Sequence, residues 1–173
     1  MPEFILGTYH LALAYLGALV FGFPSRQLIV IGVTGTDGKS STAEYAAAIF
    51  EAAGHKTALS NSIRSSVGAR SVPSAGRSMP GRFSLQRFLR DAVRANCTVA
   101  IIEMTSEGSR QYRHRGIELD ALIFTNLSPE HIESHGSLEK YADAKFELGR
   151  QLARSHKRPR IMIANGDDAE SAR

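Results

Sequence analysis

The fold of this chain is decided by the stretch Ile31-Gly-Val-Thr-Gly-Thr-Asp-Gly-Lys-Ser-Ser41. It begins inside residues 28–33, a short run of mostly β-branched residues that is typical of a buried strand. A glycine-bearing turn follows at residues 35–38. The alanine-rich residues 41–53 then have the composition of a helix, which Gly54 closes. The stretch therefore predicts a strand, a tight turn and a helix in that order.

A turn between a strand and a helix N-terminus is suited to binding phosphate, because successive backbone N–H groups there form a concave site for anions. Lys39 adds a mobile positive charge for the outer phosphates, and Ser40 adds a hydroxyl for a magnesium ion. Val33 stands where the strict P-loop pattern has its first glycine, so the match is to a variant of that pattern. The residues expected to contact a nucleotide here are Gly35, Thr36, Asp37, Gly38, Lys39, Ser40 and Ser41.

Strands and helices alternate along the rest of the chain. Further strands are predicted at residues 56–60, 99–103, 121–125 and 160–164, and further helices at residues 83–96 and 138–155. Residues 61–82 are rich in Ser, Gly, Pro and Arg without clear periodicity, and they are predicted to form a long loop. The alternation predicts an α/β fold of the P-loop type, with a mostly parallel sheet covered by helices on both faces.

The strand that ends at Glu103 is the second element that bears on chemistry. An open parallel sheet binds its ligands beyond the C-terminal ends of its strands, so the Glu103 carboxylate is expected beside the glycine turn. A carboxylate in that position is suited to binding magnesium next to the phosphates of a nucleotide. Taken alone, Glu103 is equally compatible with an ordinary acidic residue at the end of a strand.

The composition is that of an ordinary globular protein, with 43% apolar and 22% charged residues. The formal net charge of +4 suits a polyphosphate or a small anionic ligand, and also weak contact with nucleic acid. Basic residues gather between Arg150 and Arg160 without interleaved aromatic residues, so we interpret them as a solvated helix end and predict no nucleic-acid partner. Cys97 is the only cysteine, which excludes an internal disulfide framework and suits the reducing cytoplasm.

Residues 4–23 are long enough to span a bilayer. They include Thr8, Tyr9, His10 and three glycines, and Glu3 rather than a basic cluster precedes them. At helical spacing lie Leu11, Tyr15, Ala18 and Leu19, which predicts a helix packed on the domain. A membrane anchor or a signal segment is the alternative.

Three parts of the sequence resemble one family. The turn Gly35-Thr-Asp-Gly-Lys-Ser-Ser41 resembles the variant P-loop of the Mur ligases and folylpolyglutamate synthases. Residues 124–145 are similar to that family's Thr-Asn-Leu, Asp-His, His-Gly and Ala-Lys series, including the spacing from His131 to Lys145. Residues 11–28 resemble the helix that joins the first and central domains in the UDP-N-acetylmuramoyl-tripeptide synthetase branch.

This resemblance implies a set of functional residues around ATP and two magnesium ions. It implies that Ser40 and Glu103 bind magnesium, that His131 binds a second magnesium ion, and that Asn126 contacts the nucleotide. It also implies that Lys145 carries a carbamate, a CO2 adduct that gives this metal a further anionic contact. The catalytic residues expected are Lys39, Lys145 and His131.

The residues expected to contact the acceptor substrate are Thr105, Gln111 and Arg113. An arginine here suits pairing with a phosphate or a carboxylate, although a solvated arginine is the ordinary alternative. Two departures from the family pattern bear on the substrate and the metal. Ser78-Met79 stands where the family has paired threonines, which leaves the acceptor open, and Glu130 replaces the usual aspartate.

The resemblance further implies how the chain is divided. Residues 1–26 would form a linker helix, and residues 27–173 a central ATP-binding domain that is incomplete at its C-terminus and lacks the C-terminal ligase domain.

The implied activity is that of a cytoplasmic Mur-type ligase in peptidoglycan precursor synthesis. Such an enzyme activates a carboxylate as an acyl phosphate and couples it to an amino acid. The carboxylate would belong to a UDP-sugar peptide or a similar molecule. The alternatives are a folylpolyglutamate-synthase-like ligase, a non-catalytic ATP-binding module that acts with a partner subunit, and a membrane-anchored scaffold.

Overall fold

The computed structural model describes residues 3–74, 78–128 and 137–168 of the chain. Within these residues, seven strands form one sheet in the order β4-β3-β2-β5-β1-β6-β7. The five strands from β2 to β7 in this order are parallel, whereas β3 and β4 add an antiparallel hairpin at one edge. The strands are β1 (Ile29–Thr34), β2 (Thr57–Ser60), β3 (Arg64–Val67), β4 (Arg70–Pro73), β5 (Val99–Glu103), β6 (Ala121–Phe124) and β7 (Ile161–Ala164).

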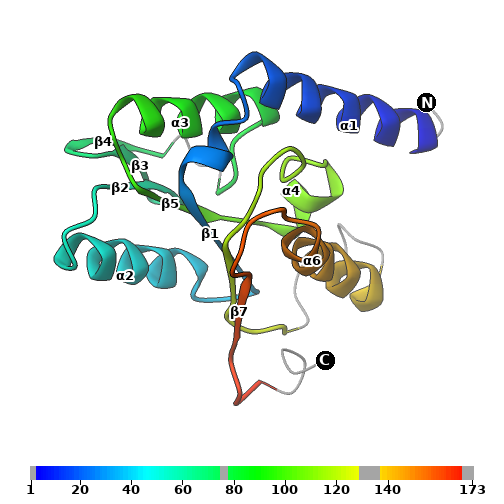
Figure 1. Ribbon diagram of the computed structural model, residues 1–173. Helices are drawn as coiled ribbons and strands as arrows, with labels where there is room; N and C mark the ends of the chain where they lie inside the picture. The colour runs from blue at the N-terminus through cyan, green and yellow to red at the C-terminus, as the bar shows by residue number, and fades with distance from the viewer. Residues whose placement is uncertain (1–2, 75–77, 129–136, 169–173) are drawn as a thin grey trace.

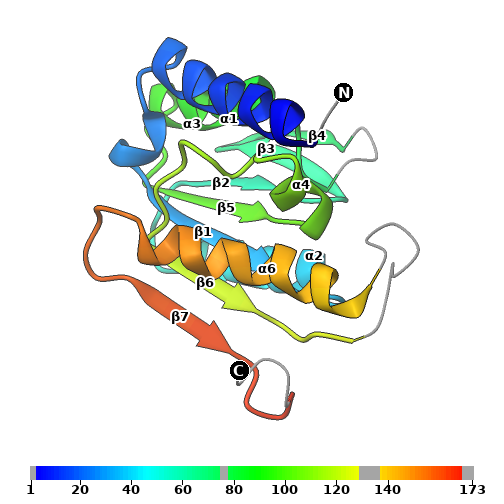
Figure 2. The same cartoon turned by 90° about the vertical axis from the view of Figure 1, so that its right-hand side faces the viewer.

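Helices cover both faces of this sheet (Figure 1). α2 packs on one face, α3 and α6 pack on the other, and α1 lies on α3 as an outer layer (Figures 1 and 2). The predicted α/β fold with a mostly parallel sheet is therefore confirmed. The helices are α1 (Glu3–Val20), the 3-10 helix η1 (Pro24–Gln27), α2 (Lys39–Ala52), α3 (Arg82–Arg94), α4 (Ser106–Arg110) and α6 (Leu138–Ala153).

The alternation of side chains along the central strands builds two apolar cores, one on each face of the sheet. Val30 of β1 belongs to the core under α3 and α6, whereas Ile31 and Val33 belong to the core under α2. All five residues of β5 are buried. Burial on both faces is why these strands appear in the sequence as nearly continuous apolar runs.

The prediction of a long loop at residues 61–82 is wrong for the part that forms β3 and β4. All four residues of β4 are exposed and β3 is only partly buried, so the hairpin has no apolar alternation to reveal it. Gly68 makes the turn between the two strands at a φ of +56°, a conformation that favours glycine. The other predicted element ends differ from the observed ones by a few residues, because local pattern does not fix where an element ends.

α1 is packed along α3, which confirms the predicted docked helix, but the expected apolar face is wrong, because Tyr15 is 48% exposed and Leu19 is 64% exposed. Ala14 and Ala18 are buried, and a Cβ added at Gly17 would lie 3.7 Å from the ring of Phe83. Among the described residues, no helix has both the length and the hydropathy needed to cross a membrane.

His114, which follows α4 in the chain, is a buried titratable residue. It is 1% exposed, and neither ring nitrogen has a hydrogen-bond partner among the described residues. Burial first, and then the charge of Arg115, lower the pKa of His114 to about 3, while Glu147 acts in the opposite direction. The imidazole is therefore neutral in the folded protein at every pH at which the protein is expected to work.

We predict that His114 makes folding weaken in mild acid. Its pKa is lower in the folded than in the unfolded chain, so its contribution to stability is complete above about pH 6.5 and is lost as the pH falls toward about 3. Between pH 7 and pH 5 this one group should lower the free energy of unfolding by about 2 kcal/mol. Urea unfolding of the wild type and of His114→Leu at both pH values measures the difference.

The matched control is His156→Gln, because His156 is exposed and its replacement should leave the pH dependence as in the wild type. An equal pH dependence in the wild type and in His114→Leu would contradict the assignment.

Candidate functional site

A cavity of about 700 Å³ opens at the C-terminal ends of β1 and β5. Figure 2 shows that the parallel strands point toward this cavity, and that α4 and the N-terminal half of α6 lie at the same end of the strands. The cavity is lined by Gly35, Thr36, Lys39, Ser40, Ser62, Ser78, Met79, Glu103, Thr105, Ser106, Glu107, Arg113, Tyr141 and Lys145. The topology thus brings the glycine turn, the predicted metal-binding carboxylate and the predicted lysine of α6 to one place.

The glycine turn passes very close to the end of β6. Gly35 has a φ of +141°, and a Cβ at this position would lie 1.9 Å from Thr125 Oγ1 and 3.0 Å from the backbone nitrogen of Asn126. No side chain fits at that distance, so the turn requires glycine here. Gly38, at a φ of +75°, is the N-cap of α2, and the helix begins at Lys39.

Asn126 holds the backbone of this turn. Its side-chain oxygen accepts hydrogen bonds from the N–H groups of Thr36, at 3.1 Å, and Asp37, at 2.9 Å. Its side-chain nitrogen donates to the carbonyl oxygen of Asp37 at 3.3 Å. The sequence predicts that Asn126 contacts the nucleotide, whereas the contacts described in the structure are all with the turn itself.

The hydroxyl of Thr36 joins the turn to α6. The Lys145 ammonium donates a hydrogen bond to it at 3.0 Å, the backbone N–H of Ser128 donates at 3.0 Å, and the hydroxyl of Tyr141 lies 3.1 Å away. Lys145 is 1% exposed, and its Nζ lies 4.2 Å from the centre of the Tyr141 ring. Lys145 therefore reaches the turn from a buried position, although 109 residues separate it from Thr36 in the sequence.

Ser40, Ser62 and Glu103 form a cluster of oxygen atoms on the opposite side of the turn. The Ser40 hydroxyl donates to Glu103 Oε2 at 2.7 Å and lies 2.7 Å from the Ser62 hydroxyl. The backbone N–H of Ser62 donates to the same carboxylate oxygen at 3.0 Å. Glu103 is 2% exposed, so these hydrogen bonds compensate for burying its charge.

Hydroxyl and carboxylate oxygens are the ligands that magnesium prefers, so this cluster fits the metal that the sequence predicts. In the described part of the chain, no three His, Cys, Asp or Glu side chains come together as a metal site. A magnesium ion held here would take its other ligands from phosphate oxygens and water, as is usual in nucleotide sites. Sequence reasoning missed Ser62, because a single serine in a segment without periodicity gives no signal.

The other residues expected to contact the nucleotide, Lys39, Asp37, Gly38 and Ser41, lie on or beside the cavity. The Lys39 ammonium donates to the carbonyl oxygen of Thr36 at 2.6 Å and lines the cavity. Asp37, Gly38 and Ser41 are exposed beside it. Because the first N–H groups of a helix have no acceptor within it, the start of α2 offers several donors to an anion beside Lys39.

The predicted substrate residues lie together, and all three have contacts within the protein. The Thr105 hydroxyl accepts a hydrogen bond from the Gly108 N–H at 3.0 Å and so caps α4, while also lining the cavity. The side-chain oxygen of Gln111 accepts from Arg113 at 2.7 and 3.1 Å. Arg113 itself lines the cavity and donates to the carbonyl oxygen of Met79 at 2.5 Å. His131 and Glu130 lie outside the described residues.

Comparison with known proteins gives one consistent family. Residues 33–173 match the model of the Mur ligase middle domain. The chain is 34% identical, over 99% of its length, to the UDP-N-acetylmuramoyl-L-alanyl-D-glutamate--2,6-diaminopimelate ligase of Geobacillus kaustophilus (strain HTA426). It is also 34% identical, over 97% of its length, to the UDP-N-acetylmuramyl-tripeptide synthetase of Roseiflexus sp. (strain RS-1). The chain spans 35% of the length of each of these two relatives.

Solved structures agree with this result. A UDP-N-acetylmuramoyl-L-alanyl-D-glutamate--2,6-diaminopimelate ligase structure is similar with a TM-score of 0.70 and 27% identity, over 84% of this chain and 28% of that one. The folylpolyglutamate synthase of Mycobacterium tuberculosis complexed with ADP is similar with a TM-score of 0.67. Its identity is 18%, over 90% of this chain and 41% of that one, so this second likeness is one of fold alone.

We predict that Gly35→Ala destabilises the protein much more than an alanine at an unconfined glycine. The new Cβ would collide with Thr125 and strain the backbone, for an expected loss of about 3 kcal/mol in the free energy of unfolding. Gly54→Ala is the matched control, because Gly54 has a φ of +87° but no atom within 4 Å of a Cβ. It should cost about 1 kcal/mol. Urea unfolding compares the two, and equal losses would contradict the close approach.

Proposed function

The chain belongs to the Mur ligase family through its middle domain, and on this basis we propose that it binds ATP and magnesium as part of an amide-bond-forming ligase. The observation that carries the proposal is the position of Lys39 and Ser40 on the cavity, with Glu103 2.7 Å from the Ser40 hydroxyl. A P-loop lysine, a hydroxyl and a buried carboxylate at the C-terminal ends of neighbouring strands are the functional groups that phosphoryl transfer needs.

In the proposed reaction, a substrate carboxylate attacks the γ-phosphate of ATP and becomes an acyl phosphate. An amino group of the second substrate then displaces phosphate and forms the amide. The start of α2 would bind the phosphates through its N–H groups, and Lys39 would exchange its contact with the Thr36 carbonyl for the outer phosphates. Ser40, Ser62 and Glu103 would hold magnesium, whose charge stabilises the transferring phosphoryl group when it is bound.

Lys145 is proposed to act on the far side of the turn, together with His131. Its buried position beside Thr36 and on the cavity supports a role close to the phosphates. The predicted carbamate forms when the neutral amine reacts with CO2, whereas in the structure the Nζ of Lys145 makes a cation–π contact 4.2 Å from the centre of the Tyr141 ring. Carbamate formation would therefore have to displace this contact, and it remains a prediction, as does the second metal at His131.

The carboxylate substrate is proposed to be a UDP-sugar peptide or a similar molecule, joined to an amino acid in peptidoglycan precursor synthesis. The support is the names of the relatives and the presence of Arg113 on the cavity. α1 is proposed to link this domain to a preceding one. The cytoplasmic location remains a prediction from the single cysteine.

The basic residues between Arg150 and Arg160 are proposed to be a solvated helix end rather than a nucleic-acid site, and ion pairs at two of them support this. Arg150 pairs with Asp143 at 2.7 Å, and Arg154 pairs with Glu147 at 2.6 Å. These carboxylates neutralise much of the positive charge that an interface with a phosphate backbone would need.

We predict that Lys39→Ala weakens the binding of magnesium–ATP by at least about tenfold, because a charge-assisted contact with phosphate is lost. Titration calorimetry of the 173-residue chain measures this affinity. Lys56→Ala is the control, since Lys56 is an exposed lysine away from the cavity and its loss should change nothing. If the folded wild-type chain binds no ATP, the proposal fails for this chain.

A second prediction concerns the metal. Glu103→Gln keeps the shape of the side chain but removes its charge, so magnesium should strengthen ATP binding about tenfold less than in the wild type. ATP binding without magnesium should stay the same. Calorimetric titrations with and without magnesium separate the two quantities, and Glu139→Gln, at an exposed position of α6, is the control. An unchanged magnesium effect in Glu103→Gln would remove Glu103 from the metal site.

A further inference from the structure

The turn between β2 and β3 carries Ser62 to the cluster of oxygen atoms beside the glycine turn. The Ser62 hydroxyl lies 2.7 Å from the Ser40 hydroxyl, and the Ser62 N–H donates to Glu103 at 3.0 Å. Connecting segments at a protein surface are mobile unless specific contacts hold them. The contacts that hold this turn therefore decide whether Ser62 reaches the cluster.

Asn61 fixes the backbone on both sides of Ser62. Asn61 is 1% exposed, and its side-chain oxygen accepts hydrogen bonds from the N–H groups of Ile63, at 2.9 Å, and Arg64, at 2.8 Å. The N–H of Asn61 donates to the carbonyl oxygen of Arg64 at 3.1 Å, which closes the turn. Asparagine side chains commonly fix turns in this way. One buried side chain thus sets the conformation of the turn.

Glu44 of α2 connects this turn to the helix that begins at the glycine turn. Its Oε1 accepts a hydrogen bond from the side-chain nitrogen of Asn61 at 2.9 Å. The Arg64 guanidinium binds the same carboxylate at two points, with Nε 2.9 Å from Oε1 and Nη2 2.7 Å from Oε2. A two-point pair of arginine and carboxylate fixes orientation as well as distance. The turn is therefore attached to α2 through both of its ends.

The position of Glu44 on α2 relates this turn to Ser40. Glu44 comes four residues after Ser40, so the two side chains lie on the same face of the helix, one turn apart. The start of the helix places Ser40, and Glu44 places Ser62 through the turn. One helix therefore sets the distance between two hydroxyls that are 22 residues apart in the sequence.

The ion pair of Glu44 and Arg64 is only partly buried, with side chains that are 28% and 33% exposed. The Arg64 guanidinium lowers the pKa of Glu44, burial acts in the opposite direction, and the Asn61 amide lowers the pKa further. The carboxylate therefore stays ionised and keeps both contacts at neutral pH. Ion pairs with this exposure contribute little to stability as a rule, so the main effect of this pair is on the geometry of the turn.

We propose that Glu44 is a positioning residue for the magnesium site. Through Asn61 and Arg64, it holds the Ser62 hydroxyl at the place where magnesium would bind. The proposal rests on the proposed function, in which Ser62 is one of the magnesium ligands, and deepens it by naming the residue that sets the position of this ligand. Neither the sequence motifs nor the comparisons assign a role to Glu44.

The first test measures the factor by which magnesium strengthens ATP binding, from calorimetric titrations with and without the ion. Ser62→Ala removes a neutral ligand and should reduce this factor about fivefold. Glu44→Ala should reduce it about threefold, because the released turn holds Ser62 in place for only part of the time. ATP binding without magnesium should stay as in the wild type in both variants.

The double variant Glu44→Ala/Ser62→Ala shows whether the two residues act through one ligand. Because Glu44 acts only through the Ser62 hydroxyl in this proposal, the double variant should match Ser62→Ala alone. Independent effects would instead multiply to about fifteenfold. That result would overturn the proposal, and so would an unchanged magnesium factor in Glu44→Ala.

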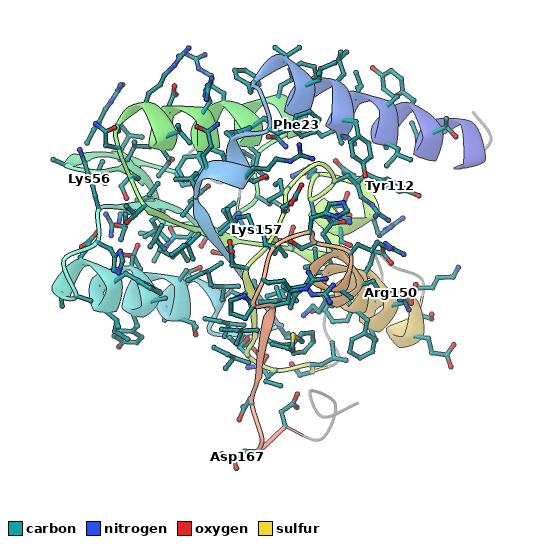
Figure 3. All side chains as sticks on the ribbon, viewed as in Figure 1. Phe23, Lys56, Tyr112, Arg150, Lys157 and Asp167 are labelled. Atoms are coloured by element: carbon teal, nitrogen blue, oxygen red, sulfur yellow. The ribbon has the colours of Figure 1, made fainter. Side chains whose placement is uncertain are left out.

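The matched control is Glu51→Ala. Glu51 also lies on α2, and its carboxylate also contacts β2 by accepting a hydrogen bond from the Thr57 hydroxyl. It does so at the other end of the helix, since Figure 3 shows Lys56, between α2 and β2, on the side of the molecule away from the start of α2. The magnesium factor should stay as in the wild type. An equal reduction in Glu51→Ala and Glu44→Ala would trace the effect to the packing of α2 and overturn the positioning role.

Hydrogen exchange of the Ser62 N–H, followed by NMR in the chain without ligands, tests the position itself. Glu103 protects this N–H only while the turn is in place, so it should exchange about tenfold faster in Glu44→Ala. Arg64→Lys keeps the charge and loses the two-point contact, so its exchange rate should lie between those of Glu44→Ala and the wild type. Glu51→Ala should exchange as the wild type does. Equal exchange in Glu44→Ala and the wild type would overturn the proposal.

The two measurements separate this proposal from the proposed function. If ATP does not bind, or magnesium does not strengthen its binding, the proposed function fails. The exchange of the Ser62 N–H then decides by itself whether Glu44 positions the turn. If Ser62→Ala reduces the magnesium factor and Glu44→Ala does not, the proposed function stands and the positioning role of Glu44 is overturned.

Discussion

The hydrogen bonds from the backbone of Thr36 and Asp37 to Asn126 are the constraint on which the rest of the site depends. They bind the turn after β1 to the segment after β6, its parallel neighbour. Gly35 makes this possible, since any Cβ there would occupy the space of Thr125. Because the turn is fixed against the sheet, the start of α2 and the hydroxyl of Thr36 are fixed as well.

The fixed turn separates two buried groups of opposite charge. Glu103 lies on one side with the hydroxyls of Ser40 and Ser62, and Lys145 lies on the other side with the hydroxyl of Thr36. Glu103 is 2% exposed and Lys145 is 1% exposed. Each of the two charged groups is hydrogen-bonded to hydroxyl groups near the cavity. A hydroxyl can bind a metal ion or a phosphate as readily as it binds the protein, so little reorganisation is needed when a nucleotide and a cation arrive.

Much of this arrangement could be predicted from the sequence, because its signals are local. A strand buried on both faces is a continuous apolar run, and the glycine turn with Lys39 and Ser40 is a short motif, so β1, α2 and β5 were predicted. The hairpin of β3 and β4 was not predicted, because exposed edge strands are held by backbone hydrogen bonds that no side-chain pattern records.

Contacts between side chains that are distant in the sequence could not be predicted either, because they depend on which strands are neighbours in the sheet. Ser62 meets Glu103 only because β2 and β5 are parallel neighbours, a pairing between segments 41 residues apart. The contact of Asn126 with the nucleotide stays a prediction, whereas its hydrogen bonds to the turn could not be predicted, since a motif does not give the direction of a side chain. The bond of Asn126 to the turn appears only when β1 and β6 are placed side by side.

The two sides of the cavity also differ in how closely their residues match the family pattern. The phosphate side uses backbone N–H groups and a few fixed side chains, and it matches the family motif at Lys39 and Ser40. The acceptor side is made of side chains from several elements, and Met79 there replaces a family threonine. Met79 is 1% exposed, and it fits because a Cβ at Gly108 would lie 2.3 Å from its sulfur. The cavity therefore presents an apolar side chain, backed by a glycine, where the family has a hydroxyl, while Lys39 and Ser40 keep the family motif on its other wall.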